Sequence, residues 1–221
     1  MITVAIDAST YAGDVAVLED SRVVAEEHVA MKGADCERLM PAVASVLERA
    51  GVGVAHIGRV VCGAGPGSFT SLRIAAGIAK GIASGRGLPL YAAPSMALLV
   101  GGADLRPGRY LAAIDALRGE FYIGLYDVAP DANVSEIEPA RLVPADEVER
   151  VAVDLDARIV SPSPFTESVV ATPRARGVAR VEALLLARGP VDVGRWEPSY
   201  GRLAEAQVRW ESAHGRPLSA G

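Results

Sequence analysis

The chain has 221 residues, half of them hydrophobic and 22% charged, so it is long enough for one large domain or two small ones with packed cores. No apolar run reaches the roughly 18 residues that a membrane helix needs, because Lys80, Asp104 and Arg106 interrupt the longest candidates. The first residues enter a strand-like pattern without a basic region or a cleavage site, so we expect no secretory signal and a cytoplasmic location. The net charge of −5 disfavours direct binding of a nucleic-acid backbone.

Cysteine and histidine are too few and too scattered to indicate a metal or redox centre. Cys36 and Cys62 lack the spacing of zinc or redox motifs, and we expect both to be small buried hydrophobic residues. His28, His56 and His214 stand singly, without the pairing that places two imidazoles on one helix face. The sequence therefore predicts no zinc or iron site.

The first hundred residues predict a strand meander followed by alternating helices and strands. Turn residues separate three strand-like segments, and a later apolar run between glycines indicates a buried strand. Pro41 lies within the first stretch of helical spacing, so this helix either begins close to Pro41 or bends there. The expected strands are 2–7, 14–19, 22–29 and 57–62, and the expected helices are 39–50 and 70–84.

The opening pattern returns in the second half of the chain. Near residue 1, a strand ends in Asp7 and is followed by a short loop and a second strand. The same order recurs after residue 109, where a strand ends in Asp115 and is followed by a short loop and another strand. The second half then continues loosely in the order of the first. We expect a strand at 140–143, a helix near 144–151, a strand at 158–161, a loop at 161–164 and a helix at about 178–188.

This internal repeat predicts two domains. The densest Gly/Pro stretch, residues 101–108, is the expected linker between an N-terminal domain at 1–100 and a smaller C-terminal domain at 109–221, of which residues 215–221 are expected to be frayed. Two tandem βββαβα-like units are typical of the actin, hexokinase and Hsp70 type (ASKHA, RNase H-like), an α/β fold with mixed sheets and a nucleotide cleft between the halves. The fold class alone does not define an activity.

A glycine-rich loop, residues 63–68, lies between the predicted strand at 57–62 and the helix at 70–84. Backbone N–H groups at such a junction can bind an anion. The loop does not match the Rossmann fingerprint, because Ser68 replaces its last glycine, and it matches neither a P-loop nor a nucleophile elbow. Two interpretations stay open: a tight strand-to-helix turn capped by Ser68 or Thr70, which we favour, and an anion-binding loop.

Asp7 and Asp115 end their strands at corresponding positions. In a duplicated actin-like fold, such carboxylates face the cleft and can position Mg²⁺ through water. Alternatively, each carboxylate caps its following turn through an Asx hydrogen bond. The segment after Asp7 contains neither lysine nor arginine, which weakens an interpretation as a phosphate-transfer enzyme. A small-molecule kinase, with Asp7 or Asp115 as Mg²⁺ ligand or base, is the alternative function.

The helix predicted after the loop is apolar almost all round, so it needs burial on two sides. Arg73 and Lys80 share one narrow polar stripe, and Gly77, Gly81 and Gly85 recur at every fourth position, which leaves a groove that another helix can approach closely. The alternatives are a central core helix and a helix between subunits. We favour the helix between subunits.

Four longer segments resemble one known family. They are residues 5–9, 65–74, 114–122 and 197–200, and they are similar to the TsaB (YeaZ) family of bacterial subunits in tRNA threonylcarbamoyladenosine synthesis. The resemblance runs from residue 1 to about residue 202. The sequence departs from the family at Ser71, where glycine is usual, and at Leu117, where arginine is common. The most specific motif is a loop formed by Gly65, Pro66, Gly67, Ser68, Phe69 and Thr70.

The resemblance implies two actin-like domains whose own cleft, with Asp7 and Asp115, is degenerate and catalytically silent. It implies a non-catalytic scaffold that binds and orders the catalytic paralogue TsaD, in the complex that transfers a threonylcarbamoyl group to N6 of the adenosine beside the anticodon in tRNAs reading codons that begin with A.

The same resemblance extends to cofactors and partners. It implies a further subunit, TsaE, contact with tRNA only through the complex, and a homodimer when TsaD is missing. It implies no cofactor on this chain alone, since ATP and a metal ion belong to the partner subunits. The partner contacts it implies are Leu39, Val43, Leu47, Leu72, Arg73, Ala76, Gly77, Lys80 and Gly81.

Overall fold

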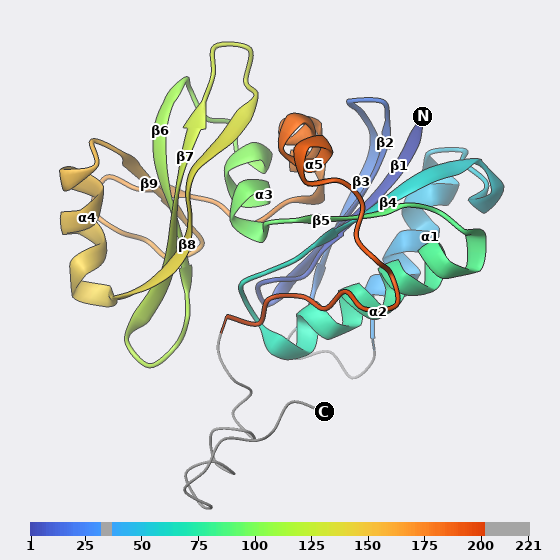
Figure 1. Cartoon of the computed structure of the whole chain (residues 1–221), viewed down its shortest axis with the longest axis horizontal. Coiled ribbons are helices and arrows are strands. Elements are labelled where there is room, and N and C mark those ends of the chain that lie inside the picture. The colour runs from blue at the N-terminus through green and yellow to red at the C-terminus, as the bar shows by residue number, and fades with distance from the viewer. Residues whose placement is uncertain (32–36, 202–221) are drawn as a thin grey trace, which may run out of the picture.

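The computed structural model describes residues 1–31 and 37–201 (Figure 1). The predictions for Cys36, His214 and the frayed end at 215–221 lie outside the described residues. Within the two described ranges, the helices are too short or too polar to cross a membrane. Cys62 is buried, as predicted.

The first half forms a five-stranded mixed sheet in the order β3-β2-β1-β4-β5. Strands β1 to β3 form an antiparallel meander, whereas β4 and β5 run parallel to β1. Parallel neighbours need crossover connections, which here contain the helices α1 and α2. The strands are β1 (Ile2–Asp7), β2 (Ala12–Glu19), β3 (Arg22–Ala30), β4 (Ile57–Gly63) and β5 (Leu90–Ala93), and the helices are α1 (Leu39–Arg49), α2 (Phe69–Arg86) and α3 (Ser95–Gly102).

The second half repeats this topology. Its sheet has the order β10-β9-β6-β7-β8, so that in both halves the first strand pairs antiparallel with the second and parallel with the fourth. The predicted duplication is therefore confirmed. Its elements are β6 (Gly108–Asp115), β7 (Glu120–Val128), β8 (Val134–Pro144), α4 (Val148–Asp154), β9 (Arg158–Ser161), β10 (Val169–Val170) and α5 (Glu182–Arg188).

Most of the predicted elements are confirmed, and the differences are local. Helix α1 begins two residues before Pro41, which places the proline in the first turn, where a missing N–H breaks no helical hydrogen bond. The helix expected at 178–188 is a short 3₁₀ turn at Ala175–Ala179 followed by α5. Strand β5 and helix α3 were not predicted, because β5 is only four residues long and α3 is apolar all round, without periodicity.

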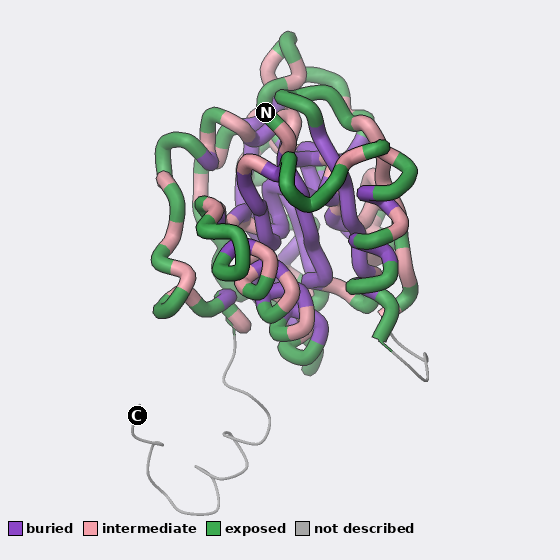
Figure 2. The backbone as a smooth tube through the Cα atoms, turned by 90° about the vertical axis from the view of Figure 1, so that its right-hand side faces the viewer, coloured by how far each residue is buried: buried purple, intermediate pink, exposed green. Residues whose placement is uncertain are grey.

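The elements stack in five layers (Figure 1). Helices α1 and α2 pack on one face of the first sheet, where Val4 and Ile6 of β1 point. The other face carries Ala5 and packs against α3, the 3₁₀ turn and α5, which also contact the second sheet. Helix α4 covers the outer face of the second sheet. The buried strands form the centre of the molecule (Figure 2).

The chain crosses between the halves more than once. The stretch expected as a linker, 101–108, starts in the last turn of α3, where Gly101 and Gly102 are buried. After β10 the chain returns to the first sheet, where Val191 forms a β-bridge with Leu90. The division into domains at 101–108 stays a prediction.

Arg59 on β4 connects α5 to the first sheet. Its side chain is 3% exposed, and its Nη1 and Nη2 donate to Glu182 Oε1 and Oε2 at 2.8 and 2.6 Å. Its Nε donates to Thr3 Oγ1 at 2.8 Å. Removing Glu182 would leave a buried guanidinium without its counterion, which is costly.

We therefore expect Glu182→Ala to lower the free energy of unfolding by about 2 kcal/mol, measured by urea denaturation. The matched control is Glu147→Ala, which removes an exposed partner of Arg150 and should change stability by less than about 0.5 kcal/mol. Equal losses in both variants would contradict the role of the buried pair.

Candidate functional site

The motif loop between β4 and α2 is a tight turn that docks on the loop after β1. The Ser68 N–H donates to the carbonyl of Ser9 at 2.7 Å, and the Gly65 N–H donates to Ser95 Oγ at 3.0 Å. These N–H groups are therefore not available to an anion. Ser68 directly precedes α2, but its side chain makes no capping bond to the helix backbone; its Oγ lies 3.1 Å from Ser71 Oγ. The contacts favour the turn interpretation, without the expected side-chain cap.

Asp7 is buried and is not among the residues that line the cavity between the halves, so of the two interpretations the Asx cap holds for it. Its Oδ1 accepts bonds from the N–H and Oγ of Ser9, at 3.0 and 2.8 Å, and its Oδ2 accepts a bond from Ser95 Oγ at 2.6 Å. Burial raises the pKa of Asp7, and these hydrogen bonds oppose the rise. Gly63 leaves the space that the carboxylate fills, since a Cβ there would lie 1.9 Å from Asp7 Oδ2. Asp7 therefore acts as an Asx cap in the core.

Asp115 is the exposed counterpart at the end of β6. Its Oδ1 accepts a bond from the Leu117 N–H at 2.7 Å, which is again an Asx turn. The hairpin that follows holds Leu117 and Arg118 at φ of 63° and 58°, a left-handed conformation that costs non-glycine residues energy. Unlike Asp7, Asp115 lines the cavity between the halves.

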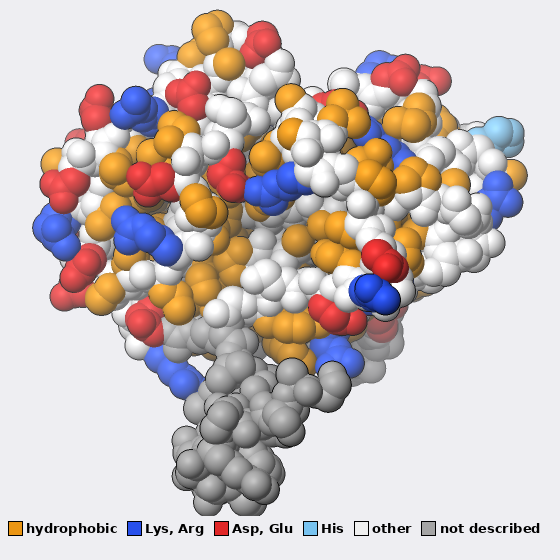
Figure 3. Space-filling model, viewed as in Figure 1, with side chains coloured by type: hydrophobic (Ala, Val, Ile, Leu, Met, Phe, Trp, Pro, Cys, Tyr) orange, Lys and Arg blue, Asp and Glu red, His pale blue; other side chains and the backbone are white. Residues whose placement is uncertain are grey.

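A cavity of about 940 Å³ lies between the two halves. Its walls come from the loop after β1, the start of α2, the β6–β7 hairpin, the loop at 162–163 and Tyr200. Hydrophobic side chains are visible on both halves beside their junction (Figure 3). Four aromatic rings line this cavity: Tyr11, Phe69, Tyr122 and Tyr200.

The predicted partner contacts divide into a buried and an exposed set. Five of them are at most 7% exposed and form part of the chain's own core: Leu39, Val43, Leu47, Leu72 and Ala76. In contrast to the expectation, these side chains are therefore not presented to another chain. Their apolar spacing reflects packing of α1 and α2 on the first sheet. Arg73, Gly77 and Gly81 are exposed, and Lys80 is partly exposed.

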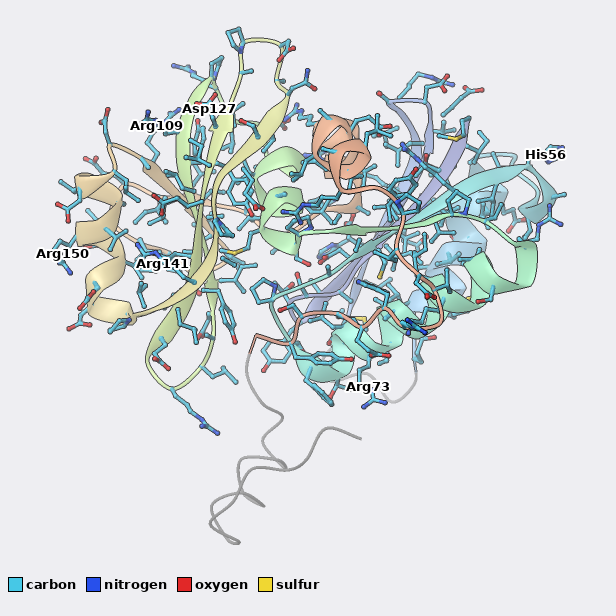
Figure 4. All side chains as sticks on the ribbon, in the orientation of Figure 1. His56, Arg73, Arg109, Asp127, Arg141 and Arg150 are labelled. Carbon is cyan, nitrogen blue, oxygen red and sulfur yellow. The ribbon has the colours of Figure 1, made fainter. Side chains whose placement is uncertain are left out.

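Helix α2 is not a central core helix. A Cβ atom built on Gly77, Gly81 or Gly85 would meet no atom within 4 Å. The glycine face of α2 is therefore open, while its other face packs on the sheet through Ala75 and Ala79. Arg73 is labelled at this face in Figure 4, and its guanidinium lies 5.4 Å from the ring centre of Phe69.

The segment at 189–201 returns along α2 to the motif loop (Figure 1). Lys80 Nζ donates to Glu197 Oε1 at 3.1 Å, and the rings of Tyr200 and Phe69 lie 4.5 Å apart. The Ser199 N–H donates to the carbonyl of Ala64 at 2.8 Å. The motif at 197–200 thus attaches the end of the described chain to the start of α2.

Sequence reasoning missed a charged cluster around Asp14 on β2. Its carboxylate accepts a bond from the Ala175 N–H at 2.7 Å and lies 2.9 Å from Arg174 Nε and 3.2 Å from His28 Nδ1. Arg174 also lies 3.5 Å from Glu26 Oε2. No local signal links β2 to residues more than 150 positions away, so only the fold reveals this cluster.

Burial raises the pKa of Asp14 to about 6, and the attraction of Arg174 opposes this rise without cancelling it. Because the folded state binds this proton more tightly than the unfolded chain does, the Asp14 contribution to stability falls as pH rises from about 4 to about 6, by about 3 kcal/mol. We expect Asp14→Asn to remove this fall. Urea denaturation of both proteins across this pH range measures the fall in the free energy of unfolding. A fall of the same size in the wild type and in Asp14→Asn would contradict the prediction.

Comparisons with known proteins agree with this fold. The family model described as TsaD, tRNA N6-adenosine threonylcarbamoyltransferase, matches residues 31–170. The "tRNA threonylcarbamoyladenosine biosynthesis protein TsaB" of Bacillus subtilis is 30% identical, over 95% of this chain and 98% of that protein. The protein of the same name from Escherichia coli is 38% identical over 57% of this chain and 55% of that protein. The solved structure of YeaZ from Pseudomonas aeruginosa superposes with a TM-score of 0.75 at 28% identity, covering 89% of this chain and 98% of that one. The α/β fold of two tandem actin-like units is thus confirmed.

Proposed function

Because the chain belongs to the TsaB (YeaZ) family, we propose that it acts in tRNA threonylcarbamoyladenosine biosynthesis as a non-catalytic scaffold. In this proposal it binds and orders TsaD, the subunit that transfers a threonylcarbamoyl group to N6 of the adenosine beside the anticodon. The observation that carries the role is the match over nearly the full length of both chains to a protein named for this pathway. A cytoplasmic location follows from the proposed role on tRNA.

The contact with TsaD is assigned to the open face of α2. Gly77 and Gly81 leave a groove in which a second helix can pack closely, and Arg73 and Lys80 flank it. Exposed Met40 of α1, 46% accessible, adds an apolar side chain for such a contact. The same face serves a homodimer when TsaD is missing.

Catalysis belongs to the partner subunits in this proposal. Asp7 is enclosed by Ser9 and Ser95 and makes hydrogen bonds to both, so it supports a structural role rather than that of a Mg²⁺ ligand. ATP and the metal ion are assigned to TsaD and TsaE, and tRNA contacts the chain only through the complex.

The decisive test is tRNA modification in a reconstituted mixture with and without this chain. The mixture contains threonylcarbamoyl-adenylate synthase, TsaD, TsaE, tRNA, ATP, threonine and bicarbonate. We expect modification to depend on this chain. Full activity in its absence would refute the scaffold role.

A further inference from the structure

Exposed apolar side chains gather around the cavity between the halves. They come from the loop after β1, the start of α2, the β6–β7 hairpin and β8, and each is 36 to 57% exposed: Tyr11, Phe69, Leu117 and Leu142. We call these four residues the apolar rim. Single exposed hydrophobic residues are common on protein surfaces, but a group of them around one cavity marks a surface that something else covers.

The chain reaches this rim where the first long described range of the second half ends. Tyr200 lines the cavity, and its ring centre lies 4.5 Å from that of Phe69. Gly201 then has a φ of 71°, and a Cβ there would lie 2.4 Å from the hydroxyl oxygen of Tyr122, which also lines the cavity. The backbone at Gly201 therefore passes directly against the second half, and the next Cα atom lies about 3.8 Å further along the chain.

The segment that follows, residues 202–213, has the sequence pattern of a short amphipathic helix. Leu203, Ala206, Trp210 and Ala213 recur at intervals of three and four residues, and most of the other positions are polar. A helix over this segment would be about 18 Å long. Isolated helices of this length are only marginally stable in water, so its apolar stripe needs a surface to pack against.

Two exposed surfaces lie near the start of this segment, and the apolar rim suits it better. The open face of α2 presents glycines instead of large apolar side chains, and Gly81 lies about 18 Å beyond Phe69 along the helix. The rim adjoins Gly201 and presents large side chains from both halves. A helix that begins at residue 202 therefore buries more apolar area on the rim than on the glycines.

We propose that residues 202–213 form a helix that docks on the apolar rim through Leu203 and Trp210 and closes the cavity between the halves. The apolar stripe of the segment covers the rim, and its charged side chains face the solvent. The occupant of the cavity mouth is then a segment of the chain itself. This inference goes beyond the proposed function, because the scaffold role requires neither the cavity nor this segment.

Fluorescence quenching of Trp210 in the full chain tests the proposal. The chain contains two tryptophans, so Trp196→Phe leaves Trp210 as the only one. We expect acrylamide to quench Trp210 about threefold less in the folded protein than in the urea-unfolded protein, at every protein concentration. Equal quenching in the two states would overturn the proposal. Protection that appears only as the concentration rises would also overturn it, because such protection comes from a second copy of the chain.

Matched substitutions in the same background locate the docking surface. Leu117→Asn removes a rim side chain at a left-handed position that asparagine tolerates, and it should raise the quenching of Trp210 at least about twofold. The control is Leu186→Asn on α5, which should change nothing, because Leu186 is equally exposed but is not among the residues that line the cavity. Within the segment, Leu203→Glu should raise the quenching as Leu117→Asn does. Val208→Glu, on the opposite face of the helix, should not.

The outcomes separate the rim from other surfaces. Unchanged quenching in both Leu117→Asn and Leu203→Glu would overturn docking on the rim. Quenching that rises in Gly81→Leu, but not in Leu117→Asn, would place the segment on the open face of α2 and overturn the proposal. The role in tRNA modification is measured separately, so failure of this inference leaves the proposed function to its own test.

Discussion

Replacing Gly81 by leucine should abolish pairing with TsaD while leaving the chain folded. Gly81 lies on the open face of α2, and a Cβ built there would meet no atom within 4 Å. Because Gly81 is exposed, a leucine side chain can extend into solvent in the monomer, and leucine is a better helix former than glycine by up to about 1 kcal/mol. When two helices pack closely at a glycine, however, a leucine side chain at that position occupies the space that the partner helix would fill.

Light scattering after mixing with TsaD measures the loss of pairing, and urea denaturation shows whether the fold is kept. The matched control is Ala187→Leu, which adds the same side chain at an exposed position of α5. Gly81→Ala should give an intermediate loss of affinity together with a small gain in stability. Wild-type pairing by Gly81→Leu would show that the partner contacts another surface.

Replacing Gly67 by alanine should cause one of the largest losses of stability among single substitutions in this chain. A Cβ at Gly67 would lie 2.0 Å from the carbonyl oxygen of Ser9 and 2.9 Å from its Cα. All of these neighbours are backbone atoms, so no side-chain rotation relieves the clash. The loop must separate from Ser9 and lose the bond that Ser68 donates there.

We expect the free energy of unfolding to fall by about 3 kcal/mol or more, measured by urea denaturation. Gly77→Ala is the matched control, because it is the same substitution at a helical glycine with open space around it. That variant should gain up to about 1 kcal/mol. A loss below about 1 kcal/mol at Gly67 would mean that the two loops are not docked as the structure shows.

Local patterns predicted most of the secondary structure and the duplication. The strands β1 to β4 and the helix α2 were found within a few residues, because apolar periodicity and glycine boundaries act over a few neighbouring positions. The repeated strand-Asp-turn-strand pattern led to two units of the same topology, which the sheet orders confirm. The motif at 65–74 identified the family from the sequence. The reason why this motif contains glycine is visible only in the structure, where the motif loop docks on the loop after β1.

The sequence by itself determined the fold class, the family and the unusual composition of α2. Only the tertiary structure decided which side chains are available for function. Asp7 and Asp115 occupy equivalent positions in the sequence repeat, yet Asp7 is enclosed in the core and Asp115 lines the cavity. The stripe at Leu39, Val43 and Leu47 has the spacing of a contact surface, but the first sheet already covers it. The physical reason is that burial and ion pairing depend on segments far apart in the chain, and local periodicity carries no information about which surface will cover an apolar face.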